Sequence, residues 1–462
     1  MKQHETAPLV PISRGRGAWL YDFDGHRYLD AISSWWVNLF GHGHPAINAA
    51  IVDQLATLEH VMLAGCTHQP VVELSERLSA LAPGKPGHCF YASDGASAVE
   101  IALKMSFHYW RNAGHARKTN FVSVAHGYHG ETVGALSVTD IPLFRDAYGP
   151  LLRHQATVPS PDARLAPEGV SPREQALAAA DALGAYLAAN RETTAALIVE
   201  PMVQGAAGMA MHDPAYLTRA RELCTRYGVH LIADEIMTGF GRTGMMFACE
   251  HAAVAPDLLC LSKGITGGYL PLSAVLARDE IYEAFYDDDL ARGFLHSHSY
   301  TGNALACRAA LAVLDLFRDN DVLEANRVSA AKLDELARPL AAHQKVENFR
   351  RLGMIWAFEV VTSRNDFARW FAAEALRHED ADQSRLRERV DHCPGQMAFV
   401  VGTACVCAEQ GEQGTRPCDE LRSGGAVRGV MDCRCAHGSS IIHMLNRFDM
   451  SYAPLCAGEV TA

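Results

Sequence analysis

The chain alternates short, fully apolar runs with longer stretches in which apolar residues recur every three or four positions. The apolar runs predict five strands, at 89–92, 121–125, 195–199, 229–233 and 258–262. The periodic stretches predict helices, the clearest at 97–110, 304–317 and 322–342. Strands that are apolar on both faces and separated by helices are typical of a mostly parallel sheet with helices on both faces. The predicted fold class is therefore α/β.

Weaker patterns flank these elements. Residues 17–30 alternate apolar and polar positions around Asp24-Gly25, which predicts a β-hairpin. Further helices are predicted at 46–62 and 70–82, and further strands at 273–276, on an edge of the sheet, and at 353–360. Beyond about residue 379 the periodicity fades, except for a short apolar run at 397–401.

Composition narrows the class of protein. The 462 residues are enough for two or three domains, and the net charge of −12 argues against non-specific binding to nucleic acid. No apolar stretch approaches the ~18 residues of a membrane span, and the first residues lack the apolar core of a signal peptide. We therefore expect a cytoplasmic protein with no nucleic-acid or membrane partner.

Two strand ends carry the most specific signal. The run at 229–233 ends in Asp234-Glu235, and the run at 258–262 ends in Lys263, followed by Gly264. Ligands of open α/β sheets bind at the carboxyl ends of the strands. A lysine and a carboxylate there suit pyridoxal phosphate, whose aldehyde forms a Schiff base with an amine and whose pyridine nitrogen needs an acid partner. The ordinary alternatives are a surface lysine at a helix start and an aspartate that caps a helix.

Two turns could complete such a site. Ser93-Asp94-Gly95-Ala96 joins a strand to a helix, where free N–H groups could bind phosphate, although a plain helix cap fits equally. Tyr128 lies in a glycine-flanked turn and could stack on a flat ring. His126 and His129 in the same turn could bind zinc, but a clear third ligand is missing, so no metal is predicted.

With these residues in place, the chain resembles the class III, fold-type I, pyridoxal-phosphate aminotransferases. The stretches at 232–244, 261–268 and 298–303 carry the match, and the resemblance covers roughly residues 5–378. Segments at 33–36, 247–251 and 304–307 point, within this class, to the branch of biotin biosynthesis. That branch transfers the amino group of S-adenosylmethionine to 8-amino-7-oxononanoate in a ping-pong reaction that gives 7,8-diaminononanoate.

The resemblance implies a role for each matching residue. Lys263 holds the cofactor and shuttles the proton, and Asp234 pairs with the pyridine nitrogen. Other matches place residues around the cofactor: Gly95 and Ala96 at the phosphate, Tyr128 near the ring, and Glu200 and Gln204 close by. Trp35 and Ser297 match substrate-contacting positions, as does Tyr128. His298 and Ser299 match a pair that reaches the phosphate from the other subunit, which implies a homodimer with a shared active site.

The resemblance also implies a division into domains. Residues 1–45 would begin a small domain, 46–303 would form the large cofactor-binding domain, and 304–379 would continue the small domain. Residues 380–462 fall outside the pattern. They are rich in Cys, Arg and Gly, hold seven of the 13 cysteines, and lack the segment that in the family supplies an arginine for the carboxylate of the oxononanoate.

This tail and the chain start are the departures from the family. A family segment before Met1 is missing, so one pocket wall would be lacking. For the tail we hypothesise a shifted reading frame, which resequencing near codon 379 would test; a disordered tail and a zinc-binding appendix are the alternatives. Three other functions stay open: an ω-amino acid, diamine or lysine aminotransferase, an inactive cofactor-binding relic, and a metal hydrolase that uses His126 and His129.

Overall fold

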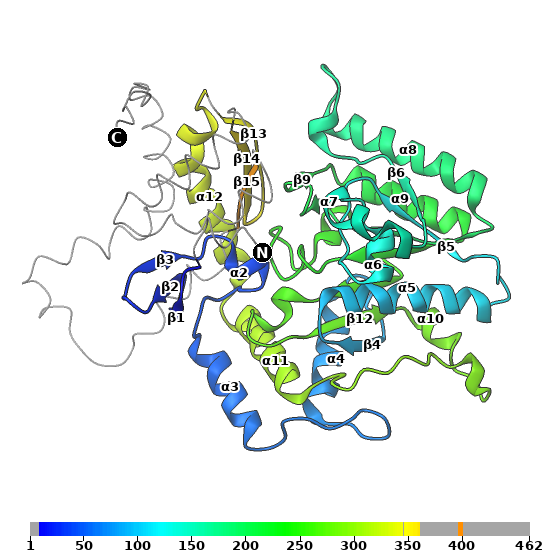
Figure 1. Ribbon diagram of the computed structural model, residues 1–462, viewed down its shortest axis with the longest axis horizontal. Coiled ribbons are helices and arrows are strands. Elements are labelled where there is room, and N and C mark those ends of the chain that lie inside the picture. Colours follow the sequence, from blue (N-terminus) through cyan, green and yellow to red (C-terminus); the bar gives the residue numbers. More distant parts are fainter. Residues whose placement is uncertain (1–8, 345, 361–395, 401–462) are drawn as a thin grey trace, which may run out of the picture.

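A seven-stranded sheet forms the centre of the larger part of the molecule (Figure 1). The computed structural model describes residues 9–344, 346–360 and 396–400. The strands lie in the order β4 (His88–Ala92), β12 (Ser273–Ala277), β11 (Leu258–Leu261), β10 (His230–Asp234), β7 (Thr194–Val199), β5 (Asn120–Val124) and β6 (Ala156–Val158). Every neighbouring pair is parallel except the two pairs that β12 makes. The other six strands therefore end at one edge of the sheet, as the α/β prediction requires.

The prediction that 273–276 lies on an edge is wrong. β12 runs between β4 and β11 and is antiparallel to both. All five of its residues are buried, because neighbouring strands cover both sides and helices cover both faces. An apolar run shows that a strand is buried, but it does not show the order of strands in the sheet.

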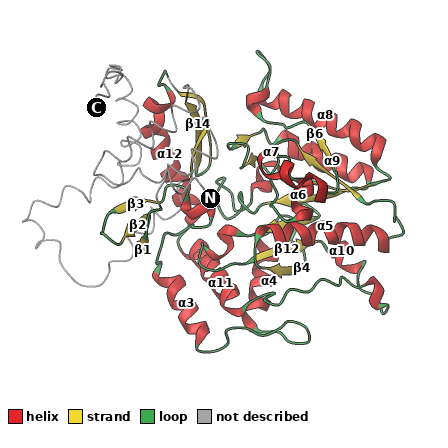
Figure 2. Ribbon diagram, in the orientation of Figure 1, coloured by secondary structure: helices red, strands yellow, loops and turns green. Residues whose placement is uncertain are grey.

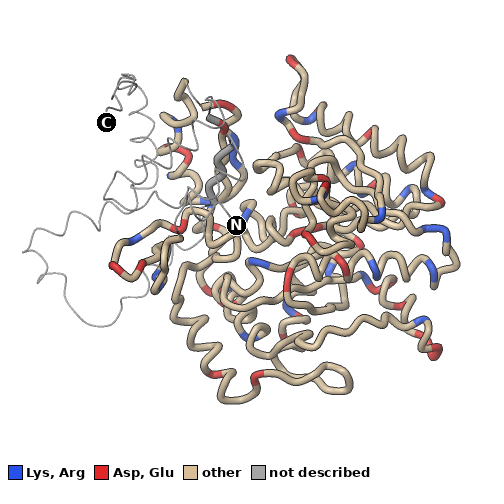
Figure 3. Tube along the Cα trace, viewed as in Figure 1, with Lys and Arg blue, Asp and Glu red and all other residues tan. Residues whose placement is uncertain are grey.

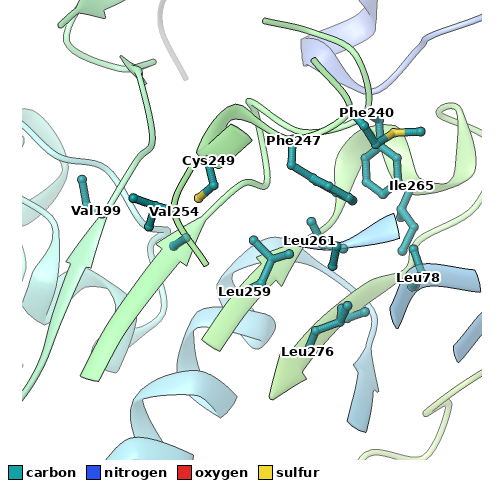
Figure 4. Packing of buried hydrophobic residues seen from close by; sticks show 14 of the residues in the cluster. Leu78, Val199, Phe240, Phe247, Cys249, Val254, Leu259, Leu261, Ile265 and Leu276 are labelled. Carbon is teal, nitrogen blue, oxygen red and sulfur yellow. The ribbon is translucent and has the colours of Figure 1, made fainter. Parts of the chain in front are cut away.

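Alternate residues of each central strand face opposite layers of helix. On β7, Ala196 and Ile198 pack in a core with α5 (Gly95–Asn112), whereas Leu197 and Val199 pack in the core beneath α8 and α9. Figure 4 shows part of this second core, in which Leu259 and Leu276 from neighbouring strands lie in one cluster with Phe247. Burial on both faces explains why the strand runs are continuously apolar rather than alternating.

The helices largely match the predicted stretches (Figure 2). The described helices of five or more residues are α3 (Pro45–Leu55), α4 (Gln69–Leu81), α5, α6 (Val133–Val138), α8 (Pro172–Asn190), α9 (Ala215–Tyr227), α10 (Asp279–Glu283), α11 (Ala304–Asp319) and α12 (Val322–Ala341). One single turn of α-helix, α7 (Pro142–Arg145), completes the set, and the short element α2 (Ser33–Trp36) is a turn whose φ values are all positive. None of the described helices is long and apolar enough to cross a membrane.

The helix predicted over 46–62 is wrong beyond residue 55. The segment after α3 leaves the helix and runs alongside the loop at 298–303. The carbonyl of Glu59 accepts a hydrogen bond from Asn303 Nδ2 at 3.0 Å, and a ring nitrogen of His60 lies 2.8 Å from the carbonyl oxygen of Ser299. These contacts across the sequence replace the local helical bonds.

Two smaller sheets lie beside the large one (Figure 1). The predicted hairpin at 17–30 is the β2–β3 pair of a three-stranded sheet, β1 (Ile12–Arg16), β2 (Trp19–Asp22) and β3 (Arg27–Leu29). The second contains β13 (Val346–Leu352), β14 (Ile355–Val360) and β15 (Gln396–Val400). Residues 397–400 of the apolar run noted in the sequence thus belong to β15, which pairs antiparallel with β14. The other predictions for the tail lie outside the described residues.

A hairpin of two short strands, β8 (Val203–Gln204) and β9 (Ala210–Met211), connects the large sheet to β14. Its Val203 and Met209 share a small apolar cluster with Ile355 and Ala357 of β14 and with Trp36. Charged residues of both signs are spread over the described chain, and few lie in the central strands (Figure 3).

Candidate active site

The carboxyl edge of the large sheet brings the predicted lysine and aspartate together. Asp234 is the last residue of β10 and pairs with Cys260 of the parallel strand β11. Lys263 follows β11 by two residues and opens a short 3-10 helix, Lys263–Thr266. Burial lowers the pKa of Lys263, while the negative charges of Asp234 and Glu200 oppose that shift. The carboxylates of Asp234 and Glu200 therefore lie close enough to the Lys263 amine to affect its pKa.

Asp234 is fixed by a buried histidine. Its carboxylate is 4% exposed, and Oδ2 lies 2.7 Å from Nδ1 of His129. The backbone N–H of Ile236 donates to Oδ1 at 3.2 Å, and the backbone N–H of His129 donates to Thr139 Oγ1 at 2.9 Å. Because His129 is itself held and buried, the carboxylate has one defined orientation.

Glu200 follows β7 at the same edge and ties two loops together. One carboxylate oxygen accepts the backbone N–H of Tyr128 at 2.9 Å, and the other accepts that of Gly205 at 2.9 Å. Burial raises the pKa of Glu200 to about 7, with Asp234 adding to the effect and His129 opposing it. Glu200 is therefore poised to carry a proton near neutral pH.

Gln204 uses both ends of its side chain within the protein. Oε1 accepts from Ser160 Oγ at 2.6 Å, and Nε2 donates to the carbonyl of Ala125 at 2.8 Å. Ala125 directly precedes the turn at 126–130, so the hydrogen bond from Gln204 helps to hold that turn in place. The prediction that Gln204 lies close to a cofactor stays a prediction; its described contacts are those of a positioning residue.

The turn at 126–130 packs against the start of α5. A Cβ atom placed on Gly130 would lie 2.7 Å from Cβ of Ala96, so only glycine allows this approach. Asp94 caps the helix by accepting the backbone N–H of Ser97 at 2.9 Å. The first N–H groups of a helix have no partner within the helix, which leaves those of Gly95 and Ala96 suited to an anion.

Tyr128 lies half-buried in the same turn. Its hydroxyl donates to Glu131 at 2.9 Å, and its ring meets Phe144 edge to face at 5.5 Å between centroids. Burial raises the pKa of Tyr128, and Glu131 raises it further, so the phenol stays protonated. Glu131 and Phe144 thus hold the aromatic ring in the turn at 126–130, within electrostatic reach of Asp234.

The structure places the remaining predicted residues farther out. A ring nitrogen of His298 lies 2.9 Å from Ser93 Oγ, two residues before Gly95, within the same chain. Ser297 and Ser299 are exposed, and so is Trp35, which is 67% exposed. The predicted contact of His298 and Ser299 with a second subunit remains a prediction.

The zinc alternative gains no support. Within the described ranges, the one group with metal-ligand spacing is Asp22, Asp24 and His26, on the β2–β3 hairpin. His129 is engaged by Asp234, and His126 is exposed. A hydrolase built on His126 and His129 is therefore not supported.

Two residues of the site carry roles that the sequence did not predict. The sequence suggests His129 only as a metal ligand, and it assigns no role to Arg242 within the stretch 232–244. Arg242 is 3% exposed, burial lowers its pKa to about 10, and it donates to the carbonyl of Trp36 at 2.6 Å. The sequence signal for Arg242 is its position as a charged residue between Gly241 and Gly244, in the loop that follows Asp234.

Comparisons with known proteins agree with this geometry. The family model described as "Aminotransferase class-III" matches residues 1–385. The adenosylmethionine-8-amino-7-oxononanoate aminotransferase of Helicobacter pylori is 46% identical over 366 residues, which are 78% of this chain and 81% of that protein. Its namesake from Methanocaldococcus jannaschii, a solved structure, matches with a TM-score of 0.78 at 33% identity, over 87% of this chain and 90% of that one.

A PLP-bound amine transaminase from an uncultivated Pseudomonas species matches similarly, with a TM-score of 0.79 at 32% identity. It covers 86% of this chain and 91% of the other. The sheet topology, the lysine and aspartate at neighbouring strand ends and these matches agree with one another. The chain belongs to the class-III aminotransferase family.

Proposed function

We propose that this chain is a pyridoxal-phosphate-dependent transaminase that moves the amino group of S-adenosylmethionine to 8-amino-7-oxononanoate, in biotin biosynthesis. The observation that carries the proposal is the position of Asp234 and Lys263 at the carboxyl ends of two parallel neighbouring strands, where the charge of Asp234 acts on Lys263. Curated relatives that are 37–46% identical bear the name of this aminotransferase.

The residues present fit pyridoxal phosphate. Each functional part of the cofactor has a matching group: a buried amine at Lys263, a fixed carboxylate at Asp234 and a glycine-lined helix start at Gly95. Ala96 would share the phosphate with Gly95, and Tyr128 would cover the ring. When bound, the cofactor supplies an electron sink for the charge that develops as a substrate loses its α-proton.

The chain's own residues would prepare and move the proton. A carboxylate at Asp234 keeps a neighbouring pyridine nitrogen protonated, and at ~4 Å such a pair attracts by roughly 4 kcal/mol at an effective dielectric near 20. His129 holds that carboxylate in place at 2.7 Å. The lowered pKa of Lys263 raises the fraction of neutral amine, so Nζ can accept a proton and return it.

Substrate and subunit contacts complete the proposal. Trp35, Tyr128 and Ser297 would face the substrates, and Glu200 and Gln204 would support the cofactor side. His298 and Ser299 would reach the phosphate of a second subunit, so the active form would be a homodimer in the cytoplasm. We also propose the division into a large domain, 46–303, with the small domain built from the segments on either side.

A second candidate keeps the chemistry and changes the amino donor. The amine transaminase from Pseudomonas matches this fold as well as the Methanocaldococcus protein does, with TM-scores of 0.79 and 0.78. An ω-amino acid, diamine or lysine aminotransferase would share every residue that holds the cofactor. The two functions differ in the amino donor or in the amino acceptor.

The test is to offer single amino donors to the protein loaded with pyridoxal phosphate. S-adenosylmethionine with 8-amino-7-oxononanoate should yield 7,8-diaminononanoate, measured by mass spectrometry. Turnover with lysine or an ω-amino acid in place of S-adenosylmethionine, with an amino acceptor present, would favour the second candidate. A protein that binds the cofactor but converts no donor would be the inactive relic, and the proposal would then be wrong.

A further inference from the structure

The segment Ser33–Trp36 has an unusual backbone. Four successive residues have positive φ values of 53°, 47°, 72° and 71°, and none of them is glycine. Ser34 and Trp35 have ψ values of 52° and 45°, which complete the left-handed helical conformation. L-residues rarely adopt this conformation, and never cheaply in succession. A strained turn of this kind persists only where its surroundings hold it.

Asp30 holds the first half of this turn. Its Oδ1 accepts the backbone N–H of Ser34 at 2.8 Å, and its Oδ2 accepts the Ser34 hydroxyl at 2.5 Å. Nε2 of His42 lies 2.9 Å from the same Oδ2. The Asp30 side chain is only 7% exposed, so these bonds form where water competes little. Burial would raise the pKa of Asp30, but the bonds to His42 and Ser34 lower it overall, so the carboxylate stays charged.

Arg242 and a small apolar cluster hold the second half. Arg242 Nη2 donates to the carbonyl of Trp36 at 2.6 Å. The Trp36 side chain is 9% exposed and packs with Met202, Met237 and Ile355. Arg242 also acts electrostatically on Lys263, so the same side chain links the turn to the lysine.

The residues after the turn lie directly on the loop that follows Lys263. A Cβ atom on Gly268 would lie 3.1 Å from Cα of Asn38, and one on Gly264 would lie 3.1 Å from Leu39. Trp36 is buried beside this contact, whereas Trp35 is 67% exposed. The turn therefore holds Trp36 in the core and presents Trp35 to solvent.

We propose that Asp30 is a positioning residue: it holds the Ser33–Trp36 turn in its left-handed form so that the flat face of Trp35 meets the aliphatic chain of the substrate. This inference deepens the proposed function and rests on it. Asp30 would thus set the affinity for substrate without touching substrate or cofactor.

The backbone part of the proposal is tested at Ser34. The variants Ser34→Ala and Ser34→Gly both lose the hydroxyl bond, so their difference reports only on the backbone. Glycine accepts a positive φ without strain, so the melting temperature of S34G should exceed that of S34A. In an extended or right-handed helical turn the order would be reversed. An S34A variant at least as stable as S34G would overturn the proposal.

The functional part is tested with two aspartates of the same small sheet. In Asp30→Asn, KM for 8-amino-7-oxononanoate should rise by about tenfold, as expected for the loss of a charge-assisted bond, while kcat and the Kd for pyridoxal phosphate stay within about twofold. Asp22→Asn is the matched control. Asp22 is also buried and accepts the backbone N–H of Asp24 and His26 at 3.0 and 2.9 Å, but it holds only the β2–β3 turn.

The control variant should lower the melting temperature and leave KM unchanged. An equal rise of KM in both variants, or no rise in Asp30→Asn, would contradict the positioning role. If the wild type converts neither proposed substrate, the proposed function fails, and the Ser34 pair still decides whether the turn is left-handed. If neither Ser34 variant yields soluble protein, the two aspartate variants decide alone.

Discussion

The two sides of the candidate site are built in different ways. One side consists of regular strand ends, where Asp234 and Lys263 take their places because two parallel strands stop at the same edge. The other side is the Ser33–Trp36 turn, which has no regular structure to support it and depends on Asp30 and Arg242. The strand side carries the groups that we propose to move protons, and the turn side carries the exposed side chain of Trp35. Substitutions on the strand side should lower kcat, and those on the turn side should raise KM.

The largest effect is expected at Lys263. The variant Lys263→Ala removes the buried amine, so it should lose both turnover and the visible absorbance of the bound cofactor. The check is a spectrum and an assay with saturating substrates. Lys332→Ala, an exposed lysine on α12, is the control and should behave as wild type. Measurable turnover in the Lys263 variant would break the assignment of this edge as catalytic.

Asp234→Asn should have the next largest effect. The variant keeps the shape of the side chain but loses the charge, so kcat should fall on the order of 10² to 10³. Asp257→Asn provides a control at the opposite end of the same strand pair. Asp257 is also buried and accepts from Arg221 and from the backbone of Leu231, both at 2.7 Å. It should lower the melting temperature and leave kcat close to wild type; equal losses of kcat would contradict the special role of the carboxyl edge.

His129→Asn should have a smaller effect on the same step. Without the bond at 2.7 Å, Asp234 loses its fixed orientation, so kcat should fall roughly tenfold. His230→Asn is the matched control, because His230 is also buried but bonds Ser106 at the amino end of β10. Stopped-flow kinetics with each variant would separate them. A His129 variant as active as the His230 variant would show that Asp234 does not need this partner.

How much of this could be predicted from sequence differs between the two sides. The strand side was predictable, because continuous apolar runs give buried parallel strands and a single charged residue at each run end stands out. The turn side was not, because Ser33 to Trp36 contain no glycine to mark a left-handed conformation. His129 and Arg242 were visible in sequence, but their partners Asp234 and the Trp36 carbonyl lie 105 and 206 positions away.

The position of the antiparallel strand β12 could not be predicted for a similar reason. Its apolar run was recognised as a strand, yet its interior position depends on pairing with β4, which lies far away in sequence. Local pattern gives the type of element, whereas strand order comes from tertiary contacts.

Beside these effects on kcat, we expect a pH dependence of stability. Burial raises the pKa of Glu200 and of Glu235 from 4.5 to about 7, so the folded state binds these protons more tightly than the unfolded state. Their contribution is present at acidic pH and is lost as the pH rises from about 5 to above 7. Each shift corresponds to a free energy on the order of 3 kcal/mol.

Chemical denaturation of the cofactor-free protein at pH 5.5, 7 and 8.5 would measure this effect. The free energy of unfolding should decrease over that range, and the decrease should be smaller in Glu200→Gln. Asp30 acts in the opposite direction at lower pH, because its pKa is lowered. A Glu200 variant with the same pH dependence as wild type would show that Glu200 is already ionised at acidic pH.

The most direct test of the whole account is an absorbance spectrum of the purified protein with pyridoxal phosphate, before and after addition of S-adenosylmethionine. The account predicts a visible band that requires Lys263 and that disappears when the donor is added, because the cofactor has taken up the amino group. A protein that shows no band with the cofactor, or a band that no amino donor changes, would contradict the assignment of this site to transamination.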